Sequence, residues 1–473
     1  MLSPGSAASL RNASQFGSTR TLLNRAGAAH RYVLPPASRI THSSRAQRFQ
    51  LLTTSSHILA RFGPLSSRRR QSPHLTRPTH LNTQSATVAA EETEAGFSHI
   101  NLPPSPTDAQ QPSISRVLLF LLGFTTISFT GAAYYSLRDT QHIASQLQSS
   151  RDVFANISSL FSSITSNGDE DVWGLGVTEP RLRVAKTHEV ATRLGMRLEW
   201  LMGWCHQLHL PESVTEFVGR SYLIVADKYL ELSPAKQVVV PVIAVNTVVF
   251  GLWTVASARR GGGNMWGWMT RNFLHRPSSN LTRTLVTSVY SHQSGLHFLF
   301  NNMALWSIGG SALFVASHQT TSIPEASTMP HFLAFFTTAG IFAATVSHIV
   351  TAIRFRRTSA LHGLEIARAT IGRQASLGSS GAIYSILVMS AFAFPNAQLG
   401  ILFVPFVSFP IGAGVAGLVA ADVAGLVFRW KTFDHAAHLA GAAFGVGYWW
   451  VGGEAWRRLK RWLVEKGALE VEA

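Results

Sequence analysis

The chain has 473 residues, of which 46% are hydrophobic, 10% aromatic and only 14% charged, and its mean hydropathy is +0.15. A soluble globular domain carries nearer a quarter of charged residues, so this composition excludes an ordinary soluble enzyme. The single cysteine, Cys205, excludes a disulfide framework and any metal site built from several cysteines.

The formal net charge of +16 is concentrated at the N-terminal end. Residues 1–90 contain 12 Arg and no Lys, Asp or Glu, so the rest of the chain, with 28 basic and 24 acidic side chains, carries only +4. A basic, acid-free leader rich in Ser and Thr is typical of an organellar transit peptide, and the first 30 residues lack the apolar segment of a secretory signal. The uneven charge also argues against nucleic-acid binding. We expect residues 1–113 to be a transit peptide followed by a disordered tether.

Seven apolar stretches are candidates to cross the ~30 Å hydrocarbon core of a membrane, which takes about 20 residues of helix. They lie at about 117–136, 238–257, 296–316, 331–353, 378–394, 411–428 and 435–452. The sequence therefore predicts an all-α polytopic membrane protein with one detached N-terminal helix and a six-helix bundle over residues 238–452. We expect residues 137–237 to form a soluble helical connector and residues 453–473 a charged tail. Because 378–394 is short for a full span, we expect that helix to begin inside the bundle and to present its N-terminus to a cavity.

The loops between the expected spans differ in charge. The loops after the second, fourth and sixth spans contain 12 basic residues and two acidic ones, Glu365 and Asp434. The loops at 317–330 and 395–410 contain no Lys or Arg and one acidic residue, Glu325. By the positive-inside rule, the basic loops and the N-terminus should share the non-translocated side of the membrane. The C-terminal tail, which is also basic, counts against this orientation.

The fifth expected span begins with a serine framed by glycines. Gly378 and Gly381 flank Ser379 and Ser380, and they permit a close backbone approach at the start of a helix whose free N–H groups favour negative charge. A serine in this place could act as a nucleophile, with its own N–H as an oxyanion donor. The alternative is a serine that only caps the helix. Tyr384, one turn further along, could pack against a catalytic imidazole.

The seventh expected span carries His438 on the same face as Gly441 and Gly445. Small residues four apart let another helix come close, so this imidazole would face a neighbouring helix and could act as a general base. Packing alone is the alternative interpretation. A zinc site formed by His435 and His438 would need a third ligand, and none lies at a suitable spacing in the sequence. We therefore expect no metal and no cofactor.

On the third expected span, His297 and Asn301 project from one face, and His292 lies just outside the span. Two neutral hydrogen-bond donors on a buried face suit an oxyanion site, although hydrogen bonding between helices would also explain them. Asp422, an acid inside the sixth span, could orient the base. We favour a structural or gating role for it, because nothing in the sequence places it beside His438.

Together these residues resemble the rhomboid family of intramembrane serine proteases. The matching motifs are H-x4-H-x3-N (His292, His297, Asn301), G-x-S-G followed by a tyrosine (Gly378 to Gly381, Tyr384) and A-H-x-x-G-x3-G (Ala437, His438, Gly441, Gly445). The leader, the detached helix and residues 430–439 resemble the mitochondrial presenilin-associated rhomboid-like branch most closely. The resemblance covers about residues 238–452 well. Residues 1–237 resemble the family only in the layout of their segments.

The resemblance implies a Ser380–His438 dyad without a catalytic acid. It also implies an oxyanion site formed by His297, Asn301 and the Ser380 N–H, with Tyr384 stacked on His438. It further implies a multi-pass enzyme of the mitochondrial inner membrane. In that membrane, the charge difference between the loops would place the N-terminus in the matrix and the C-terminus in the intermembrane space. Its substrates would be single-pass inner-membrane proteins, including dynamin-like fusion factors.

Two other function classes remain open at this point. A rhomboid-like protein can hold transmembrane clients without cutting them, but such relatives usually lose the dyad that this chain retains. A transporter would be expected to show an internal repeat, and none is apparent.

Overall fold

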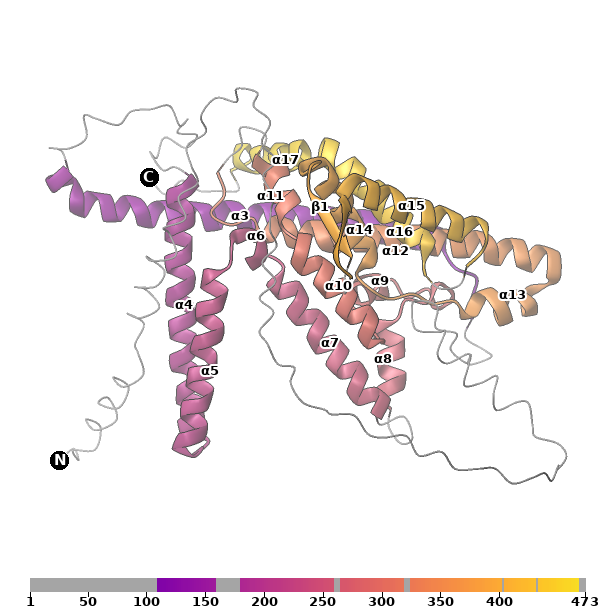
Figure 1. Ribbon diagram of the computed structural model, residues 1–473, viewed down its shortest axis with the longest axis horizontal. Coiled ribbons are helices and arrows are strands. Elements are labelled where there is room, and N and C mark those ends of the chain that lie inside the picture. The colour runs from indigo at the N-terminus through magenta and orange to yellow at the C-terminus, as the bar shows by residue number, and fades with distance from the viewer. Residues whose placement is uncertain are drawn as a thin grey trace. The chain divides into compact units, whose positions relative to one another are not determined.

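The computed structural model describes residues 109–158, 179–258, 264–318, 324–401, 404–430 and 433–467. The protein is mainly helical, with one short antiparallel hairpin of strands, β1 (Gln398–Ile401) and β2 (Val404–Pro410) (Figure 1). The helices before the expected fifth span are α3 (Ile114–Ser158), α4 (Glu179–Gln207), α5 (Glu212–Glu231), α6 (Pro234–Gln237), α7 (Val240–Ala258), α8 (Met265–Phe273), α9 (Thr284–Thr287), α10 (Gly295–Ile308), α11 (Ser311–His318), α12 (Met329–His362) and α13 (Leu364–Thr370). Those that follow are α14 (Ser380–Ala393), α15 (Ile411–Val427), α16 (His435–Gly447), a π-helix (Tyr448–Gly452) and α17 (Gly453–Glu465).

Among the described residues, three helical segments are long and apolar enough to cross a membrane: Ile114–Leu147, Pro234–Ala258 and Met329–His362. Helices α14 and α15 are apolar but shorter, with 14 and 17 residues. The stretch expected to span the membrane at about 296–316 consists of two helices, since α10 ends at Ile308 and α11 begins at Ser311. Gly309 and Gly310 break the helix where it meets α6: a Cβ on Gly309 would overlap the Val239 side chain, and one on Gly310 would overlap the Ala235 carbonyl oxygen.

Helix α3 is remote in sequence from the other apolar helices but packs along α12 in space (Figure 1). Val117 belongs to the main hydrophobic core with Phe332, Phe335 and Phe336 of α12. The start of α3 lies by the segments that follow α8 and α12, since the Ser113 N–H donates to Asn280 Oδ1 at 2.8 Å and Arg368 Nε donates to the Ala109 carbonyl at 3.2 Å. At the other end the Ala326 N–H, just before α12, donates to Thr140 Oγ1 at 3.1 Å. The two helices therefore run antiparallel.

The C-terminal helix α17 packs against α3 on this second end. Lys460 is buried and forms an ion pair with Glu325 at 2.6 Å, and Trp456 Nε1 donates to the same carboxylate oxygen at 2.6 Å. Trp456 also stacks on His331 of α12, with ring centroids 4.0 Å apart. The segment that the sequence predicts as a charged tail thus contains a helix that packs on α3 through apolar side chains. A buried ion pair joins this helix to the segment before α12.

Residues 179–231 form a helical hairpin of α4 and α5. Its internal core contains Ala191, Ala226 and Leu230, and the Tyr222 hydroxyl donates to the Leu194 carbonyl at 2.9 Å. The small side chains of Ala191 and Ala226 allow the two helices to pack closely.

Candidate active site

Ser380 is the first residue of α14, and the segment before it is fixed by backbone contacts. His275 and Ser376 form an antiparallel bridge, and the Gly378 N–H donates to the Ser288 carbonyl at 2.9 Å. Gly378 has φ +123°, a conformation that side chains with a Cβ rarely adopt, and a Cβ there would lie 2.6 Å from the His297 ring. The glycine is therefore needed for the sharp turn into α14 that presents Ser380.

Ser379 and Ser380 have different surroundings although they are adjacent. Ser379 is fully buried, and its hydroxyl lies 3.3 Å from His292 Nε2. Ser380 Oγ lies 2.9 Å from His438 Nε2. The structure thus places the serine that the motif selects, and not its neighbour, in hydrogen-bonding contact with His438.

Helices α14 and α16 bring Ser380 and His438 together through their glycines. A Cβ on Gly441 would overlap the Gly381 carbonyl oxygen, and one on Gly445 would overlap the Ser385 carbonyl oxygen. Ser385 Oγ also donates to the Gly441 carbonyl at 2.7 Å. This backbone approach is what the small-residue spacing on the seventh stretch predicts.

Asp422 of α15 lies beside His438, contrary to the interpretation drawn from the sequence. Its Oδ1 is 3.1 Å from His438 Nδ1 and 2.6 Å from His435 Nδ1, and its Oδ2 accepts a hydrogen bond of 2.5 Å from the Tyr384 hydroxyl. Asp422, His435 and His438 are all buried. The side chains therefore form a line from the Asp422 carboxylate through the His438 imidazole to the Ser380 hydroxyl.

Aromatic rings surround the imidazole of His438. Tyr384 stacks on it with ring centroids 4.5 Å apart and an interplanar angle of 14°, and Phe433 lies 6.0 Å away. Trp430 contacts His435 edge-on. These contacts hold the ring of His438 between Tyr384 and the segment before α16.

The proposed oxyanion residues line the same cavity as Ser380. The cavity has a volume of about 550 Å³, and His297, Asn301, Ser380, Asp422 and His438 are on its walls. Asn301 Nδ2 donates to the His297 carbonyl at 2.9 Å, which leaves its second N–H for another acceptor. His292 is buried behind His297, with ring centroids 5.0 Å apart.

From the sequence, Asp422 was considered as a residue that orients the base but a structural role was favoured, and His435 was not recognised as a partner of the site. The signal was present in part, because an acid inside an apolar span is costly unless it is paired. What the sequence lacked was the packing of α15 on α16, which brings residues 16 positions apart into contact. In the described ranges, no group of three or more His, Cys, Asp or Glu is arranged to hold a metal ion.

Comparison with known proteins shows that the chain is similar to rhomboid proteins. The sequence model of the Rhomboid domain family matches residues 279–455. Presenilin-associated rhomboid-like protein A, mitochondrial, of Danio rerio is 29% identical over 382 residues, which cover 78% of this chain and 80% of that protein. The human presenilin-associated rhomboid-like protein, mitochondrial, is 32% identical over 219 residues, 46% of this chain and 48% of that protein. Rhomboid protein 1, mitochondrial, of Saccharomyces cerevisiae is 31% identical over 227 residues, 47% of this chain and 55% of that protein.

The alignments with the human and yeast proteins thus span about half of each relative's length. No solved structure matches the chain.

Proposed function

Because this chain carries a rhomboid domain of the mitochondrial presenilin-associated branch, we propose that it cleaves single-pass transmembrane proteins of the mitochondrial inner membrane with Ser380 as nucleophile and His438 as base. The observation that carries the proposal is the 2.9 Å contact between Ser380 Oγ and His438 Nε2 inside a cavity formed by the bundle. A nucleophile within hydrogen-bond reach of its base is the arrangement that acyl transfer requires.

In the first half of the reaction, the Ser380 hydroxyl passes its proton to His438 Nε2 as Oγ attacks the peptide carbonyl carbon. The new C–O bond makes the carbonyl oxygen an oxyanion, for which His297, Asn301 and the Ser380 N–H are the proposed donors. When the oxyanion collapses, the C–N bond breaks and the leaving amine takes the proton from His438. A water molecule then attacks the acyl carbon and gives a proton to His438. The ester bond to Ser380 Oγ breaks, Oγ takes the proton from His438, and the carboxyl product is released.

Asp422 sets the protonation pattern that this step needs. A carboxylate that accepts from His438 Nδ1–H leaves Nε2 without a proton, so Nε2 can accept the proton of Ser380. The role is that of the third member of a serine triad, which holds the imidazole in one tautomer and orientation. We therefore propose a Ser380–His438 dyad assisted by Asp422.

A substrate segment has to be unwound to reach this site, since a helix buries its carbonyl groups in its own hydrogen bonds. Helix-breaking Gly or Pro in the substrate should therefore promote cleavage. Leu418 and Ala421 place α15 on the wall of the cavity, so we propose that substrates approach laterally beside α15 and the segment before α16. Dynamin-like fusion factors are the substrates that the resemblance implies.

The experiment that tests the activity is reconstitution of the purified protein in liposomes with a panel of single-pass substrates, together with a serine-reactive activity probe. We expect cleavage within or near the substrate membrane segment and covalent labelling of the protein. A protein that bound clients without cleaving them would pull down the substrates yet remain unlabelled, which would favour the alternative of a non-proteolytic client binder.

The oxyanion donors make a graded prediction. Removing one donor typically costs about 10²–10³-fold in rate, so Asn301→Ala and His297→Ala should lower turnover by roughly this factor and leave substrate affinity nearly unchanged. Steady-state cleavage in liposomes at several substrate densities separates the two quantities. A change confined to apparent affinity would show that these residues only position helices.

For the architecture, we propose the 1+6 arrangement, with α3 as the additional helix. The proposed domains are the leader and tether over 1–113, the first span at 117–136, the connector over 137–237, the protease core over 238–452 and the C-terminal segment over 453–473. The contacts of α3 support a division of the loops into two sets, because its start lies by Asn280 and Arg368, which belong to two of the basic loops, and its far end lies by Ala326.

We propose that the basic loops and the N-terminus face the matrix, so that the mouth of the site near Ser380 opens to the matrix and the C-terminus lies in the intermembrane space. Single cysteines at Ser359 and Ser327 in a Cys205→Ser background test this orientation. With an impermeant maleimide on intact mitoplasts, position 327 should be labelled and position 359 should not. The reverse pattern would overturn the orientation.

A further inference from the structure

The outer face of the α4–α5 hairpin is apolar and exposed, although the face between the two helices is already filled. Trp200 is 64% exposed, Trp204 48% and Phe217 71%, and the two tryptophan rings lie 5.7 Å apart. Leu208, Val214, Ile224 and Val225 on the same two helices are also exposed. So many large exposed apolar side chains on one hairpin indicate an interaction site.

The charge around this surface is unusual for the chain. Arg197 and Arg220 bound a stretch, residues 198–219, that contains no Lys or Arg and three acidic residues, Glu199, Glu212 and Glu216. Attraction to anionic headgroups cannot hold such a segment, since that mode of binding relies on basic residues. Its contact with any surface must depend on the aromatic and aliphatic side chains.

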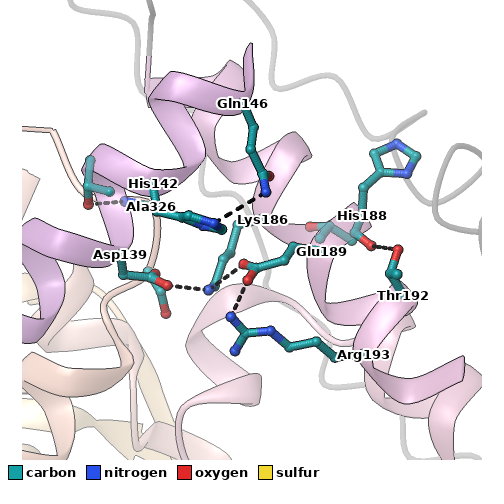
Figure 2. A network of polar contacts seen from close by, with 12 residues as sticks. Asp139, His142, Gln146, Lys186, His188, Glu189, Thr192, Arg193 and Ala326 are labelled. Atoms are coloured by element: carbon teal, nitrogen blue, oxygen red, sulfur yellow. Dashed lines mark hydrogen bonds and ion pairs between the residues drawn. The ribbon is translucent and has the colours of Figure 1, made fainter. Parts of the chain in front are cut away.

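Both ends of the hairpin are attached to apolar helices long enough to cross a membrane. Only Leu232 and Ser233 separate the end of α5 from the Pro234–Ala258 segment. On the other side, Lys186 of α4 forms an ion pair with Asp139 at 2.6 Å, near the end of the Ile114–Leu147 segment (Figure 2).

The ion pair at the base of α4 is partly buried and belongs to a network. Lys186 also pairs with Glu189 at 2.7 Å, and Glu189 contacts Arg193 (Figure 2). Burial lowers the pKa of Lys186, but the hydrogen bonds and charges of Asp139 and Glu189 outweigh it, so the pKa is raised above its usual 10.5. Lys186 therefore stays charged at neutral pH and fixes the base of α4 to α3 close to the membrane surface.

We propose that the distal half of the hairpin, residues 196–217, is an interfacial membrane anchor whose exposed face, with Trp200, Trp204 and Phe217, inserts at the boundary between headgroups and acyl chains. Tryptophan is enriched at this depth because its ring is apolar and its N–H still meets water. An amphipathic helix beside the bilayer buries its apolar face there and keeps its charged residues in water. The anchor would fix the connector on the membrane that α3 and α7 cross, and it does not depend on proteolysis.

The test uses spin labels on the full-length protein in phosphatidylcholine liposomes. The labels are placed at Trp200→Cys and Phe217→Cys on the exposed apolar face and at Glu199→Cys and Arg220→Cys as matched controls, all in a Cys205→Ser background. All four native side chains are exposed, so none of these substitutions opens the hairpin core. The measurement is the accessibility of each label to oxygen, which concentrates in the bilayer, and to a water-soluble nickel complex.

We expect labels at 200 and 217 to be reached by oxygen and protected from the nickel complex, and those at 199 and 220 to show the opposite preference. Adding anionic lipid should leave the pattern unchanged. Equal access of the nickel complex to all four labels would overturn the proposal. Protection from both reagents that disappears on diluting the protein in lipid would also overturn it, because that result would assign the surface to a second copy of the chain.

Discussion

Replacing Ser380 by alanine is expected to abolish proteolysis. The Ser380 hydroxyl lies 2.9 Å from His438 Nε2, and alanine has no group that could replace it. Removing a catalytic serine typically lowers turnover by about 10⁶-fold. The fold should be unaffected, because Gly378 makes the turn into α14 and Gly381 makes the contact with α16. The measurement is single-turnover cleavage of a single-pass substrate in liposomes, with thermal unfolding of the same preparation as the check on folding.

Ser379→Ala is the matched control, since the two serines are adjacent and both are at the start of α14. Ser379 faces His292 and makes no side-chain capping bond, so its loss should reduce activity only mildly. Equal losses in the two variants would overturn the assignment of Ser380 as the nucleophile. Full activity of the Ser380→Ala protein would remove the serine mechanism altogether.

The sequence was sufficient for the local part of the fold. Apolar stretches long enough to cross a membrane are recognised without knowing their neighbours, and the structure has long apolar helices at about 117–136, 238–257 and 331–353. The interruption of the helix at Gly309 and Gly310 was not predicted, because an apolar composition does not show whether a helix continues through two glycines. It becomes visible only when Val239 and the Ala235 carbonyl are found against them.

The site shows the same division between local and long-range information. Ser380 and His438 were found because the glycines that frame them are near in sequence and indicate close helix contacts. Asp422 is on a different helix from both, and no spacing rule relates it to His438. Its position follows from how α15 packs against α16 and α14, which depends on many contacts over the whole bundle.

The sequence predicts a water-facing helical connector over residues 137–237, and the exposed aromatic residues of α4 and α5 are the basis of the membrane contact proposed for it. Met196, Trp200 and Trp204 follow a helical spacing that is equally typical of a buried stripe. Only the observation that Ala191 and Leu194 already fill the hairpin core shows that the tryptophans are on the outside.

Replacing Asp422 by asparagine is expected to lower turnover strongly while leaving substrate binding intact. The amide of asparagine can donate to His438 Nδ1, which would place the imidazole proton on Nε2, where it can no longer accept the proton of Ser380. Where an aspartate orients a catalytic histidine, this substitution costs about 10⁴-fold in turnover. Labelling by a serine-reactive probe should slow in parallel, because it needs the same proton transfer.

Tyr384→Phe is the control that separates this role from general disturbance around Asp422. It removes the hydroxyl that donates to Asp422 Oδ2 but keeps the ring that stacks on His438, so we expect only a small loss of turnover. His435→Ala should also cost less than Asp422→Asn, because Asp422 keeps its contacts with Tyr384 and His438. If Asp422→Asn retained nearly full turnover and probe labelling, Ser380 and His438 would act as a dyad without an acid, as the resemblance alone implies. Asp422 would then serve only to join α15 to α14 and α16.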